Sequence, residues 1–301
     1  MGVRPGACVV MLGGCGFVGR ALARELHARG YRLRLLTRRP DRNRDLLVLP
    51  RLELWEGDVH DEGFLREAAR GAQALVNLVG ILKERAPGDF ARVHEELPAR
   101  MARSGRGLRL LQVSAAGADA ASDSAYLRSK ARGEARLREL APDAIIVRPS
   151  VIYGPGDHFV DRFRRLLPWA PWGLPVPLAE SPIAPVYVDD VASGIATALA
   201  RTGAAGQGYG FCGPEILSLG DTVAAIATLC GRARPRGLSA PTSLLLARLL
   251  EYWPGTPFSV DQWRTLRAGS VCPEGAPGLP DLGVRPRPFR EALEALVRGH
   301  A

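Results

Sequence analysis

Short apolar runs alternate with longer segments of helical period along the first half of the chain. The runs lie at 7–12, 32–37, 51–56, 74–79, 109–114 and 144–149. The segments between them lie at 17–29, 61–70, 89–104 and 124–140. Strands that alternate with helices at this spacing predict βαβ crossovers and a doubly wound parallel sheet. The expected fold class is therefore α/β, with a Rossmann-type sheet.

The pattern changes after about residue 150. Proline and glycine crowd 154–185, and helical periods return at 189–200, 218–230, 241–252, 259–268 and 288–298. Ligands of open α/β sheets bind at the carboxyl ends of the strands, so a lobe built from these segments would cover that edge. The sequence predicts a nucleotide-binding domain over 1–152 and a smaller, mostly helical substrate lobe over 153–301, parts of which would complete the sheet.

A glycine-rich turn, LGGCGFVGR (12–20), links the first predicted strand to the first predicted helix. Glycine allows a tight turn, close approach of a pyrophosphate and close packing of helix on sheet, while the helix amides face the phosphates. This order of strand, turn and helix predicts dinucleotide binding rather than a plain glycine turn. The residues expected at the pyrophosphate are Gly13, Gly14, Gly16, Phe17, Val18 and Gly19.

The end of the second strand bears on which dinucleotide binds. An acidic residue here holds the ribose 2′-hydroxyl of NAD, whereas an arginine accommodates the 2′-phosphate of NADP. The strand ends in Thr37, Arg38 and Arg39, and the first acid after it is Asp41. The sequence therefore favours NADP(H) over NAD(H). The alternative is that both arginines are ordinary exposed residues of an arginine-rich chain.

The third and fourth strands are followed by further cofactor candidates. After the third strand, Asp58 is placed to accept a hydrogen bond from the adenine amino group, with Val59 against the ring. The alternative role for an acid there, a helix cap, already suits Asp61. After the fourth strand, Leu78, Val79 and Gly80 are expected to floor the adenosine half of the cofactor.

Lys130 is one of only two lysines in a chain with 40 basic residues. It follows Tyr126 by four positions in a segment of helical period, so both side chains lie on one face. An ammonium beside a phenol favours the ionised phenol, and a lysine stem can also reach a ribose hydroxyl. Ser114 ends the fifth strand. Together these three residues predict a proton-transfer site beside a hydride donor, rather than exposed polar positions.

GGCGFVG, GDVHD, Ser114, YLRSK and VRPSVIYGPGD occur in an order that resembles the extended or atypical short-chain dehydrogenase/reductases. The resemblance implies that Tyr126 is the general acid/base and that Lys130 binds the nicotinamide ribose and lowers the Tyr126 pKa. It also implies that Ser114 orients the substrate. Pro149 and Val151 would lie beside the nicotinamide.

A closer resemblance covers the chain from residue 8 almost to its end. YLRSKARGEARLREL, PVYVDDVASGI, YGFCGPE and PGLPDLGVRP resemble the NADPH-binding accessory subunit of respiratory complex I and its bacterial relatives. In that subunit the bound NADPH is regarded as structural. Three functions therefore stay open: an NADP(H)-dependent oxidoreductase or epimerase, a non-catalytic NADPH-binding subunit of a membrane-associated assembly, and a redox-sensing regulator.

Composition limits the partners and the compartment. The formal net charge is +9, but the arginines are dispersed and lack the interleaved aromatics of a nucleic-acid surface, so no nucleic acid is expected. The five histidines share no spacing, and no metal is expected. The five cysteines are scattered and odd in number, which is typical of buried thiols in a reducing compartment. Without a signal peptide or spanning run, the chain is expected to be cytoplasmic.

Two stretches of the second half suit a membrane surface or a hydrophobic substrate such as a quinone or lipid. FRRLLPWAPWGLPVPL combines arginines with Trp169 and Trp172, and PTSLLLARLLEYWPG (241–255) is strongly apolar but too short to span a bilayer. The alternative is that both stretches pack over the cleft as core. A peripheral position on the inner face of the membrane is thus one expectation for this chain.

Overall fold

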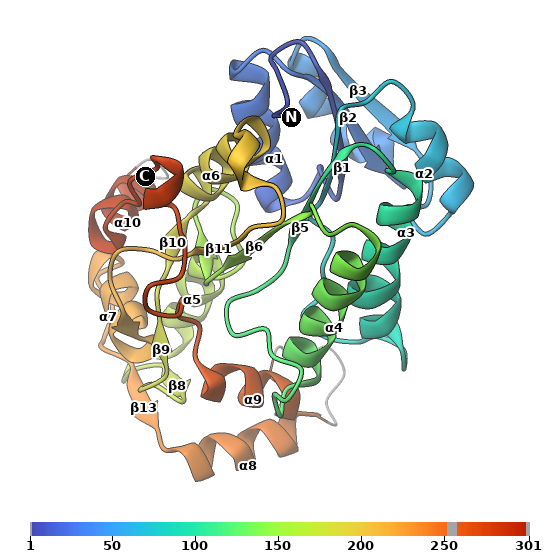
Figure 1. The fold of residues 1–301 in the computed structure, drawn as a ribbon. Coiled ribbons are helices and arrows are strands. Elements are labelled where there is room, and N and C mark those ends of the chain that lie inside the picture. Colours follow the sequence, from blue (N-terminus) through green and yellow to red (C-terminus); the bar gives the residue numbers. More distant parts are fainter. Residues whose placement is uncertain (1, 252–257, 299–301) are drawn as a thin grey trace.

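The computed structural model describes residues 2–251 and 258–298, and its centre is a parallel sheet of seven strands (Figure 1). Six of the strands are those that the sequence predicts, and the seventh, β11, comes from the second half of the chain. In sheet order the strands are β11 (Gly208–Phe211), β6 (Ile145–Pro149), β5 (Arg109–Val113), β4 (Ala74–Asn77), β1 (Cys8–Leu12), β2 (Arg32–Thr37) and β3 (Leu52–Glu56). The crossover from β3 back to β4 beside β1 creates the switch point at which dinucleotides bind in such sheets.

Helices cover both faces of the sheet, as the predicted doubly wound class requires (Figure 1). The α1 and α6 helices pack on one face, around a core that includes Leu22 and Ile195. The α2, α3 and α4 helices pack on the other face, with Leu65, Met101 and Leu137. These helices are α1 (Phe17–Ala28), α2 (Glu62–Ala69), α3 (Leu97–Ser104), α4 (Ala125–Leu140) and α6 (Val188–Ala200).

The remaining elements form a lobe beside the carboxyl ends of the strands (Figure 1). Its helices are α5 (Val160–Leu166), α7 (Leu219–Leu229), α8 (Ala240–Glu251), α9 (Val260–Ala268) and α10 (Phe289–Arg298). Its strand pairs are β7 (Ile152–Tyr153) with β10 (Val186–Tyr187), β8 (Pro175–Pro177) with β13 (Arg236–Leu238), and β9 (Pro182–Ile183) with β12 (Leu217–Ser218). Tyr153 and Phe289 pack edge to face in the core of this lobe.

The segment predicted as one helix over 89–104 is divided in the structure. A π-helical turn over Ala91–Glu96 precedes α3, and Pro98 lies at the start of α3. The turn packs tightly against α4, because a Cβ added at Gly133 would lie 1.7 Å from the carbonyl oxygen of His94. Only glycine fits there, and the close packing directs the His94 side chain toward the helix that carries Tyr126.

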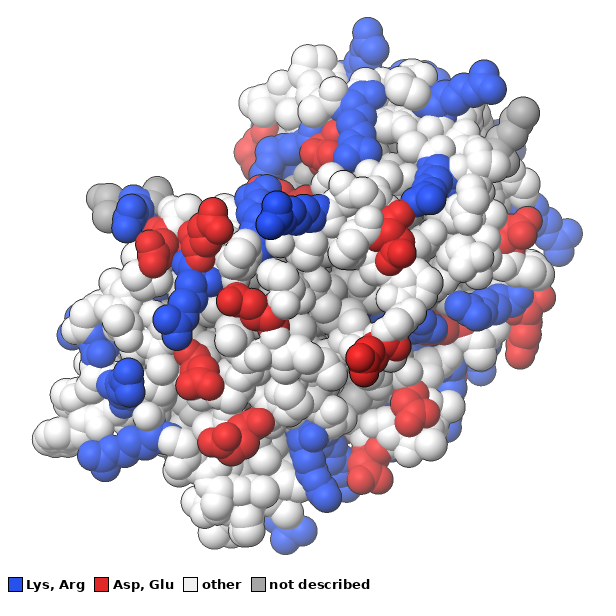
Figure 2. Space-filling model, turned by 60° about the vertical axis from the view of Figure 1, so that its left-hand side comes forward, with Lys and Arg blue, Asp and Glu red and all other residues white. Residues whose placement is uncertain are grey.

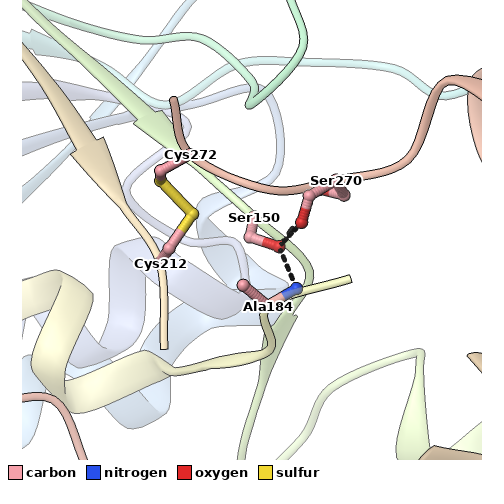
Figure 3. The surroundings of a disulfide bond; sticks show 5 residues. All are labelled: Ser150, Ala184, Cys212, Ser270 and Cys272. Carbon is pink, nitrogen blue, oxygen red and sulfur yellow. Dashed lines mark hydrogen bonds between the residues drawn. A yellow bond between two sulfur atoms is a disulfide. The ribbon is translucent and has the colours of Figure 1, made fainter. Parts of the chain in front are cut away.

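Cys212 and Cys272 form a disulfide across two segments that are 60 residues apart in sequence (Figure 3). The prediction that all five cysteines are separate thiols is therefore wrong for this pair. β11 runs beside the 272–278 segment, where the Gly210 amide donates to the Pro277 carbonyl at 2.8 Å. The pairing comes from this long-range contact, which no cysteine spacing reveals. Cys8, Cys15 and Cys230 are free thiols.

The two stretches considered for a membrane or a cleft have different outcomes. Trp169 and Trp172 are 86% and 82% exposed, so the expectation that they pack over the cleft is wrong. α8 buries Ala247 and exposes Leu245 and Leu249, while positions 252–255 of the predicted segment lie outside the described residues. No helix within the described ranges has the length and apolar character to cross a membrane.

Charged side chains of both signs are intermixed on the face shown in Figure 2, and uncharged side chains cover much of its centre. On this face, the charges are thus mixed rather than gathered in one basic field. Among the residues that the structure describes, no group of three or more histidine, cysteine or acidic side chains is arranged to hold a metal ion.

Candidate nucleotide-binding and catalytic site

The glycine-rich turn leaves room for a phosphate group at the start of α1. Gly13 has a φ of +73°, and a Cβ there would lie 3.1 Å from the Val79 amide nitrogen. A Cβ at Gly19 would lie 2.4 Å from the Gly14 carbonyl oxygen, so α1 approaches the turn as closely as backbone allows. No side chain caps α1 and no acid lies in its first turn. The Gly16 amide donates to the Gly13 carbonyl at 3.0 Å and closes the turn. A helix start without a cap or an acid is the kind of site that favours an anion.

The arginines after β2 are exposed, and no ion pair of either is found among the described residues. The Arg39 amide donates to the Thr37 hydroxyl at 3.2 Å, which fixes the start of the loop. The nearby acids are already paired with other cations: Asp41 with Arg44 at 2.6 Å, and Asp45 with Arg20. The Arg20 hydrogen bond lowers the Asp45 pKa. The charge of Arg38 and Arg39 is therefore available to an incoming anion.

The other cofactor candidates lie along the same edge of the sheet. Asp58 is exposed and accepts from the His60 amide at 3.0 Å, which leaves its second carboxylate oxygen 3.8 Å from Arg92. Asp61 caps α2, as expected. Val59 and Val79 both pack against the core under α2, and Leu78 packs against the core on the α1 face. Asn77, fully buried, bonds Gln112 and the Val79 amide and so shapes the turn after β4.

The structure brings the serine, tyrosine and lysine to the adjacent ends of β5 and α4. Ser114 follows β5, and Lys130 Nζ donates to the carbonyl of the preceding Val113 at 3.4 Å. The same Nζ lies 5.9 Å from the centre of the Tyr126 ring. Ser114 is 5% exposed, and its hydroxyl has no hydrogen-bond partner among the described residues. A buried hydroxyl without a partner is costly, so this one suits a ligand oxygen.

Backbone hydrogen bonds hold the residues after β5 against the end of β6. The Ser114 amide donates to the Val147 carbonyl at 2.8 Å, and the Ala116 amide donates to the Pro149 carbonyl at 2.8 Å. Val151 follows two residues later and packs against the core of the second lobe. A Cβ at Gly80 would lie 3.1 Å from Lys130 Nζ, so glycine keeps the space beside the ammonium open.

Burial sets the protonation of the site. It raises the pKa of Tyr126 to about 12, and it lowers that of Lys130 to about 8 against the opposing effect of Glu134. The resemblance implied that Lys130 would lower the Tyr126 pKa, whereas in this structure burial dominates. Tyr126 is therefore a neutral phenol near pH 7, which is the form that donates a proton.

Asp261, from α9 of the second lobe, binds the start of the helix that carries Tyr126, beside the N-cap residue Ser124. Its carboxylate accepts from the Ala125 amide at 2.6 Å and the Tyr126 amide at 3.2 Å. It also accepts from the Ser124 hydroxyl at 3.2 Å. The sequence analysis missed this role, because an aspartate in the first turn of α9 is also an ordinary helix-start residue. The second lobe thus holds the start of α4 in place.

His94 is the other functional neighbour that the sequence did not indicate. Its Nε2 accepts from the Ile81 amide at 3.1 Å, and its Nδ1 lies 2.8 Å from the Ser129 hydroxyl. Burial and the charge of Lys130 lower its pKa to about 3, so the ring is neutral. The ring packs edge to face against the Tyr126 ring, and the two ring centres are 5.5 Å apart. His94 therefore joins the turn after β4 to the helix of Tyr126.

The fold and this edge of the sheet define an NAD(P)H-binding protein of the short-chain dehydrogenase/reductase type. The NAD(P)H-binding family model matches residues 13–158. A solved structure of the dTDP-glucose 4,6-dehydratase DesIV from Streptomyces venezuelae, with NAD and TYD bound, superposes with a TM-score of 0.74. The superposition covers 97% of this chain and 96% of DesIV, and the two sequences are 21% identical. This similarity shows that the two proteins share a fold.

Two relatives specify the family further. The mitochondrial NADH dehydrogenase (ubiquinone) 1 alpha subcomplex subunit 9 of Mus musculus is 31% identical over 97% of this chain and 80% of its own length. The chain belongs to the family of these complex I subunits, which confirms the resemblance read from the sequence. The ceramide reductase of Caulobacter vibrioides is 36% identical over 62% of this chain and 58% of its own length.

Proposed function

We propose that the protein is an NADP(H)-dependent oxidoreductase that reduces a carbonyl group of an apolar, lipid-like or quinone-like substrate. The observation that carries the proposal is the unpartnered, buried Ser114 hydroxyl beside a neutral Tyr126 and the Lys130 ammonium. A carbonyl oxygen bound there would meet two hydroxyl donors. The relative named ceramide reductase supports the apolar class of substrate.

The cofactor would lie along the carboxyl edge of the sheet. The amides of the 13–19 turn would bind the pyrophosphate, and Arg38 and Arg39 would bind a 2′-phosphate. Asp58 and Val59 would contact the adenine, with Leu78, Val79 and Gly80 beneath the adenosine. Pro149 and Val151 would border the nicotinamide. When bound, the nicotinamide supplies the hydride that such a reduction needs.

The three side chains would divide the proton transfer among them. Ser114 donates a hydrogen bond to the carbonyl oxygen and orients it. Tyr126 donates its phenolic proton to that oxygen, which becomes the hydroxyl of the product. Lys130, when charged, stabilises the phenolate that remains and binds the ribose. An epimerase would use the same groups without net consumption of cofactor.

Nucleotide titration tests the cofactor part of the proposal. NADPH should bind more tightly than NADH, since two charge-assisted contacts to a phosphate are worth about 1.5–3 kcal/mol each. The Arg38→Ala/Arg39→Ala variant should lose roughly 100-fold or more in NADPH affinity and keep its NADH affinity. Arg106→Ala, an exposed arginine after α3, serves as the matched control. Equal affinity of the wild type for both nucleotides would contradict the preference.

The reaction is tested by following NADPH absorbance with 2-dodecanone and decylubiquinone as probes. Net oxidation of NADPH supports an oxidoreductase. A bound NADPH that neither probe oxidises, with no turnover in a wider panel of long-chain ketones and aldehydes, rejects the enzymatic proposal. Inversion of a sugar-nucleotide centre by protein loaded with NADP⁺, with no net change in NADPH absorbance, would indicate the epimerase instead.

A second function is favoured by the extent of the family match. The subunit 9 relatives align over 97% of this chain, including the second lobe, so the whole fold rather than the cofactor domain alone is shared. In this alternative the protein binds NADPH as a non-catalytic subunit of a membrane-associated respiratory assembly. Tagged protein should then co-purify with NADH:quinone oxidoreductase subunits from detergent-solubilised membranes. Recovery without those subunits would reject the alternative.

A further inference from the structure

Two tryptophans are among the most exposed large side chains of the described structure. Trp169 ends a short 3₁₀ helix that follows α5, and Trp172 lies in the next turn. The turn is held by hydrogen bonds from the Ala170 amide to the Leu167 carbonyl at 3.2 Å and from the Gly173 amide to the Ala170 carbonyl at 3.0 Å. With Pro168, Pro171 and Pro175 in the same stretch, both indoles project from a stiff support.

A distant part of the chain brings further arginines to this turn. β13 pairs with β8 so that Arg236 lies opposite Pro175, and the Arg236 amide donates to the Leu174 carbonyl at 2.8 Å. The segments meet at Gly173, which has a φ of +108° and where a Cβ would lie 2.4 Å from the Arg234 carbonyl oxygen. The two segments are therefore fitted to each other.

The surface around the tryptophans carries mostly unbalanced positive charge. Residues 158–177 and 231–238 contain six arginines and a single acid, Asp161. Asp161 lies 3.7 Å from both Arg164 and Arg165, and no other ion pair of these arginines is found in the described structure. A hollow along α5 is lined by His158, Asp161, Arg162, Arg165 and Leu166.

We propose that this tryptophan–arginine face binds a bilayer surface that contains anionic lipids; its residues are Arg162, Arg165, Trp169, Trp172, Arg234 and Arg236. Indoles favour the boundary between headgroups and acyl chains, and arginines pair with lipid phosphates. The excess of arginine over acid on this face favours an anionic lipid surface over a neutral one.

Co-sedimentation of the full chain with vesicles tests the proposal. The protein should sediment with phosphatidylcholine/phosphatidylglycerol vesicles (3:1) and much less with pure phosphatidylcholine vesicles. Trp169→Ala/Trp172→Ala and Arg234→Glu/Arg236→Glu should each lower partitioning roughly tenfold or more. Arg66→Glu/Arg106→Glu, which makes the same change of charge near α2 and α3, should leave it unchanged. All three variants should keep the NADPH affinity of the wild type.

Tryptophan fluorescence supplies an independent readout. Brominated lipids should quench the wild type, whereas Trp169→Phe/Trp172→Phe should still sediment with the vesicles and lose most of the quenching. Equal binding to neutral and anionic vesicles, or no binding to either, would overturn the proposal. A tryptophan-dependent dimer that does not bind vesicles would assign the face to a second copy of the chain and would overturn it as well.

Discussion

Replacing Cys212 and Cys272 by alanine removes the one disulfide of the described structure and opens a loop next to the proposed site. Cys272 lies two residues after Ser270, and the Ser150 hydroxyl contacts the Ser270 hydroxyl at 3.2 Å and accepts from the Ala184 amide at 3.3 Å (Figure 3). Ser150 directly follows Pro149 at the end of β6. The disulfide therefore supports the segment that borders the expected nicotinamide position.

The size of the effect follows from the length of the closed loop. The cysteines are 60 residues apart, and closing such a loop removes ~14 cal/mol/K of chain entropy, or about 4 kcal/mol at 25 °C. Unfolding a chain of 301 residues carries an entropy of about 0.6 kcal/mol/K. The Tm of the Cys212→Ala/Cys272→Ala variant should thus fall by about 7 °C.

Differential scanning fluorimetry with and without dithiothreitol measures the change. Reductant should lower the Tm of the wild type to that of the double variant and should not affect the double variant further. Cys230→Ala, which removes a free thiol, should behave as the wild type does in both buffers. A wild type that takes up an alkylating reagent at all five cysteines after non-reducing denaturation would refute the pairing.

Three further predictions concern the helix that carries Tyr126. Asp261→Ala should lower the free energy of unfolding by about 1–2 kcal/mol in urea titrations, because the Ala125 and Tyr126 amides lose their acceptor; an unchanged midpoint would contradict this role. The rate of carbonyl reduction should fall above pH 8, where Lys130 loses its proton, and Lys130→Arg should move the fall to higher pH; a wild-type rate that is constant to pH 10 would contradict the loss of a required Lys130 charge near pH 8. Gly133→Ala should lower the free energy of unfolding by about 3 kcal/mol or more, because the new Cβ meets the His94 carbonyl. Gly203→Ala is the control: its Cβ would have nothing within 4 Å, and its free energy of unfolding should stay within about 0.5 kcal/mol of the wild type.

The strands of the sheet were predictable because each is a short apolar run with polar residues at its ends. The runs at 7–12 and 32–37 appear as β1 and β2 with nearly the same bounds. The π-helical turn at Ala91–Glu96 was not predictable, because its sequence has an ordinary helical period. It depends on the approach of α4 at Gly133, which is a contact between segments that are far apart in sequence.

The positions of the candidate site residues were predictable where a local motif sets them. The glycine turn and the pair Tyr126 and Lys130 follow from spacing within one element. The contributions of Asp261 and His94 come from packing between elements, and the high pKa of Tyr126 comes from burial, which no local pattern reports. The exposure of Trp169 could not be predicted either, because an aromatic residue in a proline-rich loop is as compatible with core as with surface.

Single-turnover oxidation of bound NADPH tests the central claim most directly, which is that Tyr126 gives its proton to a carbonyl substrate. Enzyme loaded with NADPH is mixed with an excess of the best carbonyl probe, and the decay of absorbance at 340 nm is followed for the wild type, Tyr126→Phe and Tyr187→Phe. Tyr187 lies in the second lobe and is the matched tyrosine control.

We predict that Tyr126→Phe binds NADPH as the wild type does and oxidises it roughly 100-fold or more slowly, since a positioned proton donor contributes about 10²–10⁴ to a rate. Tyr187→Phe should react at the wild-type rate. Equal rates for the wild type and Tyr126→Phe would contradict the proposed mechanism. Bound NADPH that stays unoxidised in all three proteins would support the non-catalytic subunit instead.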